Sequence, residues 1–105
     1  MKDGRIEAGD ILCASFGYEA KLTDFYKVVK RTPKQVELVR LKERCFDYHG
    51  MEGWMVEPTD EEIGDSFRRK VKADWYDGEE CVKVRDYGSV ARLWSGKPIH
   101  NYNWH

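Results

Sequence analysis

Short segments in which apolar and polar residues alternate recur along the chain and predict strands. The first, residues 9–15, places Leu12 and Ala14 on one face. Two β-rich runs, 25–30 and 35–41, flank the sequence RTPK, whose proline suits a turn and not the centre of a strand. We therefore expect these two runs to form a hairpin.

The apolar residues of the second run change face part-way along it. Val36 and Leu38 share one face, whereas Val39 and Leu41 share the other. A strand keeps a single parity unless a bulge interrupts it or both of its faces are covered. The pattern predicts one of these two arrangements.

Phe25 and Tyr26 are neighbours on the first run, so they point to opposite faces of the predicted strand. Phe25 shares its face with Lys27 and Val29, and Tyr26 shares the other with Lys30, so alternation alone does not choose the buried face. Because phenylalanine has no hydroxyl that needs a partner, we expect Phe25 and Val29 to face the core and Lys27 to reach solvent. Tyr26 would then be half covered, either against a second element or against a ligand.

The rest of the chain predicts short elements joined by turns. In order they are a strand at 54–58, one helical turn at 59–64 with a capping-box spacing, a strand at 66–76, a turn at Asp77-Gly78, a strand at 80–87, a short helix at 89–94 capped by Ser89, and a strand at 99–104. Five to seven short strands with frequent turns predict a mainly β fold. We expect one domain, 1–105, an antiparallel barrel or sandwich (an SH3-like barrel being favoured) with one or two short helices.

Charge is arranged in blocks, although the net charge is only −1. Residues 21–44 carry a net charge of +5, residues 45–65 carry −7, and the run FRRKVK, residues 67–72, adds +4. Such blocks either give a surface with two oppositely charged faces or pair with each other in the fold.

Nothing in the sequence predicts a metal, a cofactor or catalysis. Cys45 and His49 are four residues apart, but structural zinc sites usually have close Cys or His pairs at both ends. One short loop rarely holds a Cys–His dyad rigidly, and neither a nucleophile elbow nor a phosphate-binding glycine loop is present. We expect no enzymatic activity.

The three cysteines, Cys13, Cys45 and Cys81, form no disulfide framework and suit a reducing cytoplasm. The first ten residues lack the apolar core of a signal peptide, and no apolar run approaches the length of a membrane helix. The sequence therefore predicts a soluble protein of the cytoplasm that makes no membrane contact.

Two charged sets are candidate binding surfaces. A basic and aromatic set suits nucleic acid or a nucleotide: Tyr18, Tyr26, Lys27, Lys30, Arg31, Lys34, Arg68, Arg69 and Trp94. Lysines also protect edge strands, and a net charge of −1 is unusual for a general DNA-binding domain. An acidic set is able to imitate a nucleic-acid backbone toward a basic partner, or simply to solvate a loop: Asp47, Glu52, Glu57, Asp60, Glu61 and Glu62.

Several blocks resemble a family of small proteins of unknown function from bacteriophages and mobile elements. The first combines GDIL at 9–12, Ser15, GY at 17–18, DFY at 24–26 and VV at 28–29, followed by a hairpin arm at 34–36; family members often have Trp where this chain has Phe16. Ile63 to Val71 and Ala91 to Pro98 are also similar to that family, in which Asp often replaces Ser95.

The resemblance implies a phage or mobile-element origin and no particular activity. Genes of this size in phages often encode host-takeover proteins, including inhibitors of bacterial defence. We therefore expect a non-catalytic protein that occupies or sequesters a component of its bacterial host. A host protein is the first expected partner, through interface residues such as Trp94, and a nucleic acid or small nucleotide is the second.

Overall fold

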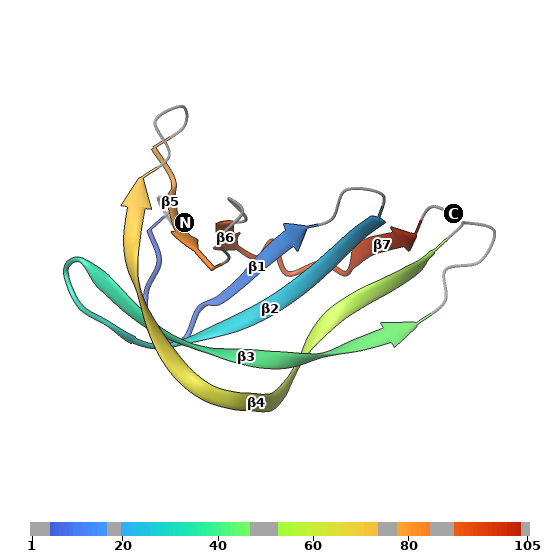
Figure 1. Ribbon diagram of the computed structural model, residues 1–105, viewed down its shortest axis with the longest axis horizontal. Helices are drawn as coiled ribbons and strands as arrows, with labels where there is room; N and C mark the ends of the chain where they lie inside the picture. The colour runs from blue at the N-terminus through green and yellow to red at the C-terminus, as the bar shows by residue number, and fades with distance from the viewer. Residues whose placement is uncertain (1–4, 17–19, 47–52, 74–77, 85–89, 104–105) are drawn as a thin grey trace.

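The computed structural model describes residues 5–16, 20–46, 53–73, 78–84 and 90–103, and these form an antiparallel β structure (Figure 1). Its strands are β1 (Ile11–Phe16), β2 (Ala20–Arg31), β3 (Gln35–Phe46), β4 (Trp54–Ala73), β5 (Glu80–Lys83), β6 (Val90–Leu93) and β7 (Ile99–Asn103). The predicted mainly β class is confirmed, and so are the first strand, the β2–β3 hairpin and the last strand. The SH3-like assignment stays a prediction.

The strands form two closed circuits that share a wall. Six strands follow the order β1-β6-β5-β4-β3-β2, and β1 also pairs with β2, which closes a ring. The seventh, β7, pairs with β2 and with the beginning of β4, which closes a second and smaller circuit. Strands β2, β3 and β4 therefore belong to both circuits.

Each circuit has its own apolar core. The first core contains Ile6, Leu12, Ala14, Tyr26, Val28, Val36, Leu38, Val82 and Ala91. The second contains Phe25, Leu41 and Val56, with Ile11, Cys13, Trp54, Trp94 and Ile99 packed against them. Alternate residues of β1 and β2 enter different cores, so both faces of these strands are covered.

The two neighbouring aromatics divide between these cores. Phe25 is fully buried, as expected, in the second core. Tyr26 was expected to be half covered, and this is wrong: it lies in the first core and is only 6% exposed. Val29 was expected in the core and instead is 46% exposed. The pairing of β2 with β3 shifts between Val28 and Lys30, so a bulge at Val29 takes its side chain out of the alternating pattern.

The predicted change of parity in β3 has the second of its two proposed causes. Where the pairing of β3 with β4 shifts, between Leu38 and Arg40, the extra residues lie on β4, so β3 itself has no bulge there. Leu38 and Val39 are both buried although they are adjacent, so both faces of β3 are covered at this point. The prediction is confirmed.

Strand β4 replaces the strand, helical turn and strand predicted between 54 and 76. One residue lies between Leu38 and Arg40 on β3, whereas three lie between their partners Phe67 and Ile63 on β4. Gly64, with a φ of +73°, lies within this bulge. Glu62 and Ile63 pair with β3 and the whole segment belongs to strand β4, so the predicted turn of helix at 59–64 is wrong.

The hydroxyl of Thr59, expected to cap that helical turn, has another use. It donates to the carbonyl oxygen of Lys42 at 2.7 Å and accepts the N–H of Glu61 at 3.3 Å. The hydrogen bonds of the Thr59 side chain therefore stabilise an irregular part of the β3–β4 pairing instead of the start of a helix.

The helix predicted at 89–94 is also wrong, because residues 90–93 form β6 between β1 and β5. Ala91 from this strand is fully buried in the first core, and Ser89 lies outside the described residues. The described part of the chain holds no helix, and hence none long and apolar enough to cross a membrane. Gly78 has the positive φ that its predicted turn requires, whereas Asp77 is outside the described ranges.

Candidate functional site

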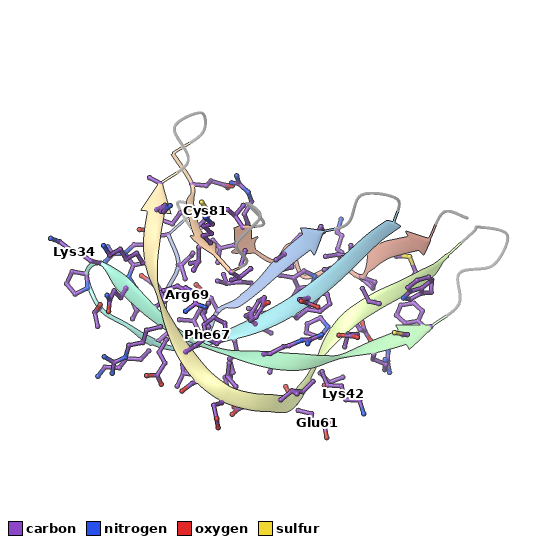
Figure 2. All side chains as sticks on the ribbon, in the orientation of Figure 1. Lys34, Lys42, Glu61, Phe67, Arg69 and Cys81 are labelled. Carbon is purple, nitrogen blue, oxygen red and sulfur yellow. The ribbon has the colours of Figure 1, made fainter. Side chains whose placement is uncertain are left out.

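Acidic and basic blocks pair with each other where β4 begins and β3 ends. Arg44 forms an ion pair with Glu57, and the ammonium of Lys42 lies 3.6 Å from a carboxylate oxygen of Glu61 (Figure 2). Antiparallel pairing of β3 with β4 brings these side chains together. Of the two arrangements expected for the charge blocks, mutual pairing describes this end of the molecule.

Three of the four described residues in the predicted acidic set lie near bases. Besides Glu57 and Glu61, Glu62 lies 4.0 Å from the ammonium of Lys27 on β2. Asp60 is exposed, and Asp47 and Glu52 lie outside the described residues. These ion pairs reduce the negative field that an imitation of a nucleic-acid backbone needs.

The opposite end of the hairpin carries four exposed lysines, which we call the lysine surface: Lys30, Lys34, Lys70 and Lys72. None of them forms an ion pair with any residue that the structure describes. Lys34 and Lys70 lie close together because the backbone N–H of Val71 donates to the carbonyl oxygen of Lys34 at 2.9 Å, and Gln35 pairs with Lys70. The lysine surface thus joins the β2–β3 turn to the last third of β4.

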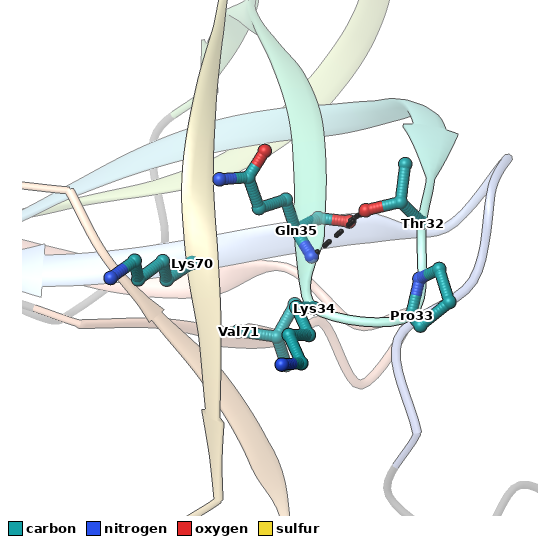
Figure 3. A pocket seen from close by; sticks show the side chains of 6 residues that line it. All are labelled: Thr32, Pro33, Lys34, Gln35, Lys70 and Val71. Carbon is teal, nitrogen blue, oxygen red and sulfur yellow. Dashed lines mark hydrogen bonds between the residues drawn. The ribbon is translucent and has the colours of Figure 1, made fainter.

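An open hollow lies within the lysine surface (Figure 3). Its lining consists of Thr32, Pro33, Lys34, Gln35, Lys70 and Val71, and its volume is about 680 Å³. The turn beneath it is held by the N–H of Gln35, which donates to the Thr32 hydroxyl at 3.1 Å. The residues that line this hollow include two lysines and no acid, so its electrostatics suit an anion.

Arg31 was expected in the binding patch, but the structure places it in an internal ion pair. Its Nη1 and Nη2 donate to the two carboxylate oxygens of Glu80 at 2.9 and 3.1 Å. The same guanidinium donates to the carbonyl oxygens of Ile6, Thr32 and Pro33. All five of its N–H donors are used, so Arg31 is a structural residue that joins β2 to β5 and the N-terminal segment.

Glu80 links the stability of the fold to pH. The side-chain hydrogen bond from Arg31 is the main cause that holds the pKa of Glu80 below its usual value, the backbone N–H of Ile6 assists, and burial opposes. Because the folded pKa is depressed, this contribution to stability is complete above the unfolded pKa of about 4.3 and is lost as the pH falls through the folded pKa.

We expect Glu80→Gln to be less stable than the wild type at pH 7, with the difference shrinking as the pH falls below about 4. The measurement is urea unfolding of both proteins from pH 7 to pH 3. Glu79→Gln is the control, because it changes the neighbouring carboxylate on the same segment and leaves the Arg31 pair in place. A difference between wild type and Glu80→Gln that stays constant with pH would contradict this assignment.

The other predicted basic residues have partial partners. Arg68 lies 3.5 Å from a carboxylate oxygen of Glu37, and Lys27 faces Glu62. The guanidinium of Arg69 lies 4.7 Å from the ring centroid of Phe67, a cation–π contact. These three basic residues flank the lysine surface, but each already has a carboxylate or an aromatic ring of the same chain as its partner.

The predicted aromatic residues are core residues where the structure describes them. Tyr26 packs edge-to-face against Phe67, and Trp94 packs in the same way against Phe25 in the second core. The indole N–H of Trp94 donates to the carbonyl oxygen of Lys97 at 2.8 Å. Tyr26 and Trp94 therefore do not belong to the lysine surface. Tyr18 lies outside the described residues.

The sequence analysis did not place Lys72 in the binding set, although Arg68, Arg69 and Lys70 of the same basic run suggest a second basic patch. Alternation along the strand is the signal that could have identified the full set. Residues 68, 70 and 72 share one face of β4, whereas 69 and 71 share the other. Only the cross-strand register brings Lys70 next to the turn that holds Lys34.

The possible Cys45–His49 dyad is only partly described. Desolvation of the thiol, and then the neighbouring Glu43 carboxylate, raise the pKa of Cys45, although the residue as a whole is exposed. Its thiol is therefore protonated at neutral pH, which disfavours a nucleophile. His49 lies outside the described ranges, and the residues within them contain no group of three metal-ligating side chains.

Comparison with known proteins finds no match: no protein-family model, no curated protein and no solved structure is similar to this chain. The candidate site therefore depends on its own geometry and charge. The phage and mobile-element resemblance stays a prediction from the sequence.

Proposed function

We propose that this chain is a non-catalytic binding protein whose lysine surface contacts the phosphate backbone of a nucleic acid. The supporting observation is the unequal distribution of ion pairs. Bases near the end of β3 face acids across the strand pair, whereas Lys30, Lys34, Lys70 and Lys72 have no acidic partner among the described residues. Positive charge is therefore concentrated at one end of a protein whose net charge is −1.

Lysine ammonium groups act as point charges toward phosphate and carry no base specificity. Binding through this surface is therefore expected to depend on salt and very little on sequence. Four lysine–phosphate contacts predict that log K falls with log salt with a slope of about −3.

We expect Lys34→Glu combined with Lys70→Glu to lower the affinity for a single-stranded oligonucleotide about tenfold or more at low salt, and to reduce the salt slope by about 1.5. Fluorescence anisotropy over a salt series measures both quantities. The matched control is Lys42→Glu with Lys97→Glu, which changes the net charge equally at two exposed lysines outside the lysine surface. Equal losses in the two double variants would show that only net charge matters and would reject the site.

A host protein is the second candidate partner, and the exposure of Val29 favours it. Its side chain is 46% exposed on β2 directly beside Lys30, and apolar groups of this kind serve protein contacts and not phosphate contacts. Under this alternative, Val29→Ala weakens the capture of a protein from a bacterial lysate and leaves oligonucleotide affinity unchanged.

We further propose a phage or mobile-element origin, action on a host component and a cytoplasmic location, with interference with host defence as one such action. The motifs that resemble phage proteins support the origin. Cys13, Cys45 and Cys81 form no disulfide, which suits a reducing compartment.

A further inference from the structure

The middle of β4 has an open hydrogen-bonding edge. One edge of β4 pairs with β3 along most of its length, whereas the other pairs with β7 only at Trp54–Val56 and with β5 only at Val71–Ala73. No strand in the described part of the chain pairs with this second edge between 57 and 70. In Figure 1 the middle of β4 forms the outer rim of the bowed sheet. Such an edge is a template for another strand.

The charge pattern along this open edge is complementary to the same edge of a second copy that runs antiparallel to it. Acids precede Asp65 and bases follow it. Antiparallel pairing of two copies about a two-fold axis at Asp65 places Glu61 opposite Arg69 and Glu62 opposite Arg68. Because the axis repeats every contact, these two pairs give four attractive contacts.

The apolar residues of the edge meet in the same register. Ile63, which is 41% exposed, comes opposite Phe67 of the other copy. One unfavourable contact remains, since Asp65 faces its own counterpart on the axis. The neighbouring Gly64 and Ser66 leave room for these two carboxylates to turn toward solvent.

The faces of the strand agree with this register. Ile63 and Phe67 are the partners of Arg40 and Leu38 on β3, which lie on the same side of the sheet. Glu62 and Arg68, which oppose each other in the proposed register, are the partners of Leu41 and Glu37 on β3, and these two also share one side of that strand.

We propose that two copies of this chain associate through the open edges of β4, in antiparallel register about Asp65. The contact is confined to the middle of one strand and is much smaller than a standard interface, so the dimer is weak and forms at high protein concentration. It is also sensitive to salt, because exposed ion pairs fix its register.

Charge exchange between two variants tests this pairing. One variant carries Glu61→Lys and Glu62→Lys, and the other carries Arg68→Glu and Arg69→Glu. Each variant alone opposes like charges and is expected to be monomeric, whereas an equal mixture restores every attractive contact and is expected to form the heterodimer. Native mass spectrometry at low salt distinguishes these species by mass, and sedimentation over a dilution series gives their affinities.

A single chain with all four substitutions provides the matched control, because its exchanged charges again attract and it is expected to dimerise like the wild type. Circular dichroism checks that every variant is folded. The proposal is overturned if the wild type stays monomeric at its highest soluble concentration, or if the mixture associates no more than its components. None of the four residues belongs to the lysine surface. The experiment can therefore reject the dimer without rejecting oligonucleotide binding, and the reverse.

Discussion

Replacing Phe25 by alanine is expected to lower the free energy of unfolding by about 3–5 kcal/mol, and replacing Tyr26 by alanine is expected to cost a similar amount. The two residues are adjacent on β2, and a strand with one solvated face would tolerate the loss of one of them. Here each side chain lies in a different core, Phe25 against Trp94 and Tyr26 against Phe67. Urea unfolding followed by circular dichroism measures both values.

Val29→Ala is the control on the same strand, and its expected cost is about 0.5 kcal/mol or less because the bulge leaves this side chain exposed. Large losses at both Phe25 and Tyr26, with little change at Val29, are the signature of a strand shared by two circuits. If Phe25→Ala or Tyr26→Ala costs as little as Val29→Ala, only one face of β2 is buried and the account of two cores is wrong.

Arg31→Ala is expected to destabilise the protein by about 2–3 kcal/mol, somewhat less than the cost of breaking a fully buried pair because these side chains are 12% and 23% exposed. The substitution leaves the Glu80 carboxylate without its main partner and removes the donors to three backbone carbonyl oxygens. These contacts connect β2, β5 and the segment containing Ile6. Thermal and urea unfolding measure the loss.

Lys30→Ala is the matched control, because it removes the adjacent positive charge from an exposed position. Its expected effect is within about 0.5 kcal/mol. Equal effects of Arg31→Ala and Lys30→Ala would contradict the structural role of Arg31. The comparison also matters for binding studies, since charge reversal at Arg31 lowers the stability of the fold and would weaken binding without changing the lysine surface.

The sequence predicts those elements whose signals are local. Alternation in residues 9–15 and the proline turn between 25–30 and 35–41 predict β1 and the β2–β3 hairpin. The parity change in β3 predicts that both of its faces are covered, which was one of its two interpretations. These signals depend only on residues close together in the chain, and tertiary packing reinforces them.

The predicted turn of helix at 59–64 fails because the same local signal serves two structures. A threonine followed three residues later by glutamate suits a helix start, yet Thr59 stabilises a bulged strand once β3 lies beside it. Val29 fails for a related reason. Its bulge is set by the pairing of β2 with β3, which no single run of sequence contains.

The candidate site was only partly predictable for the same physical reason. Block charges indicate where acids and bases gather, but only strand register decides that Lys42 meets Glu61 while Lys34 and Lys70 meet no acid in the described ranges. Register likewise separates Arg31, which is consumed by Glu80, from its exposed neighbour Lys30.

The most direct test of the proposed function is a nuclear magnetic resonance titration of the ¹⁵N-labelled protein with a single-stranded oligonucleotide at low salt. The expected result is a set of shifting amide signals centred on Lys34, Gln35, Lys70, Val71 and Lys72, which return to their free positions as salt is added. No shifts at low salt, or shifts centred on the ion-paired region around Lys42 and Glu61, would contradict the assignment of the lysine surface as the binding site.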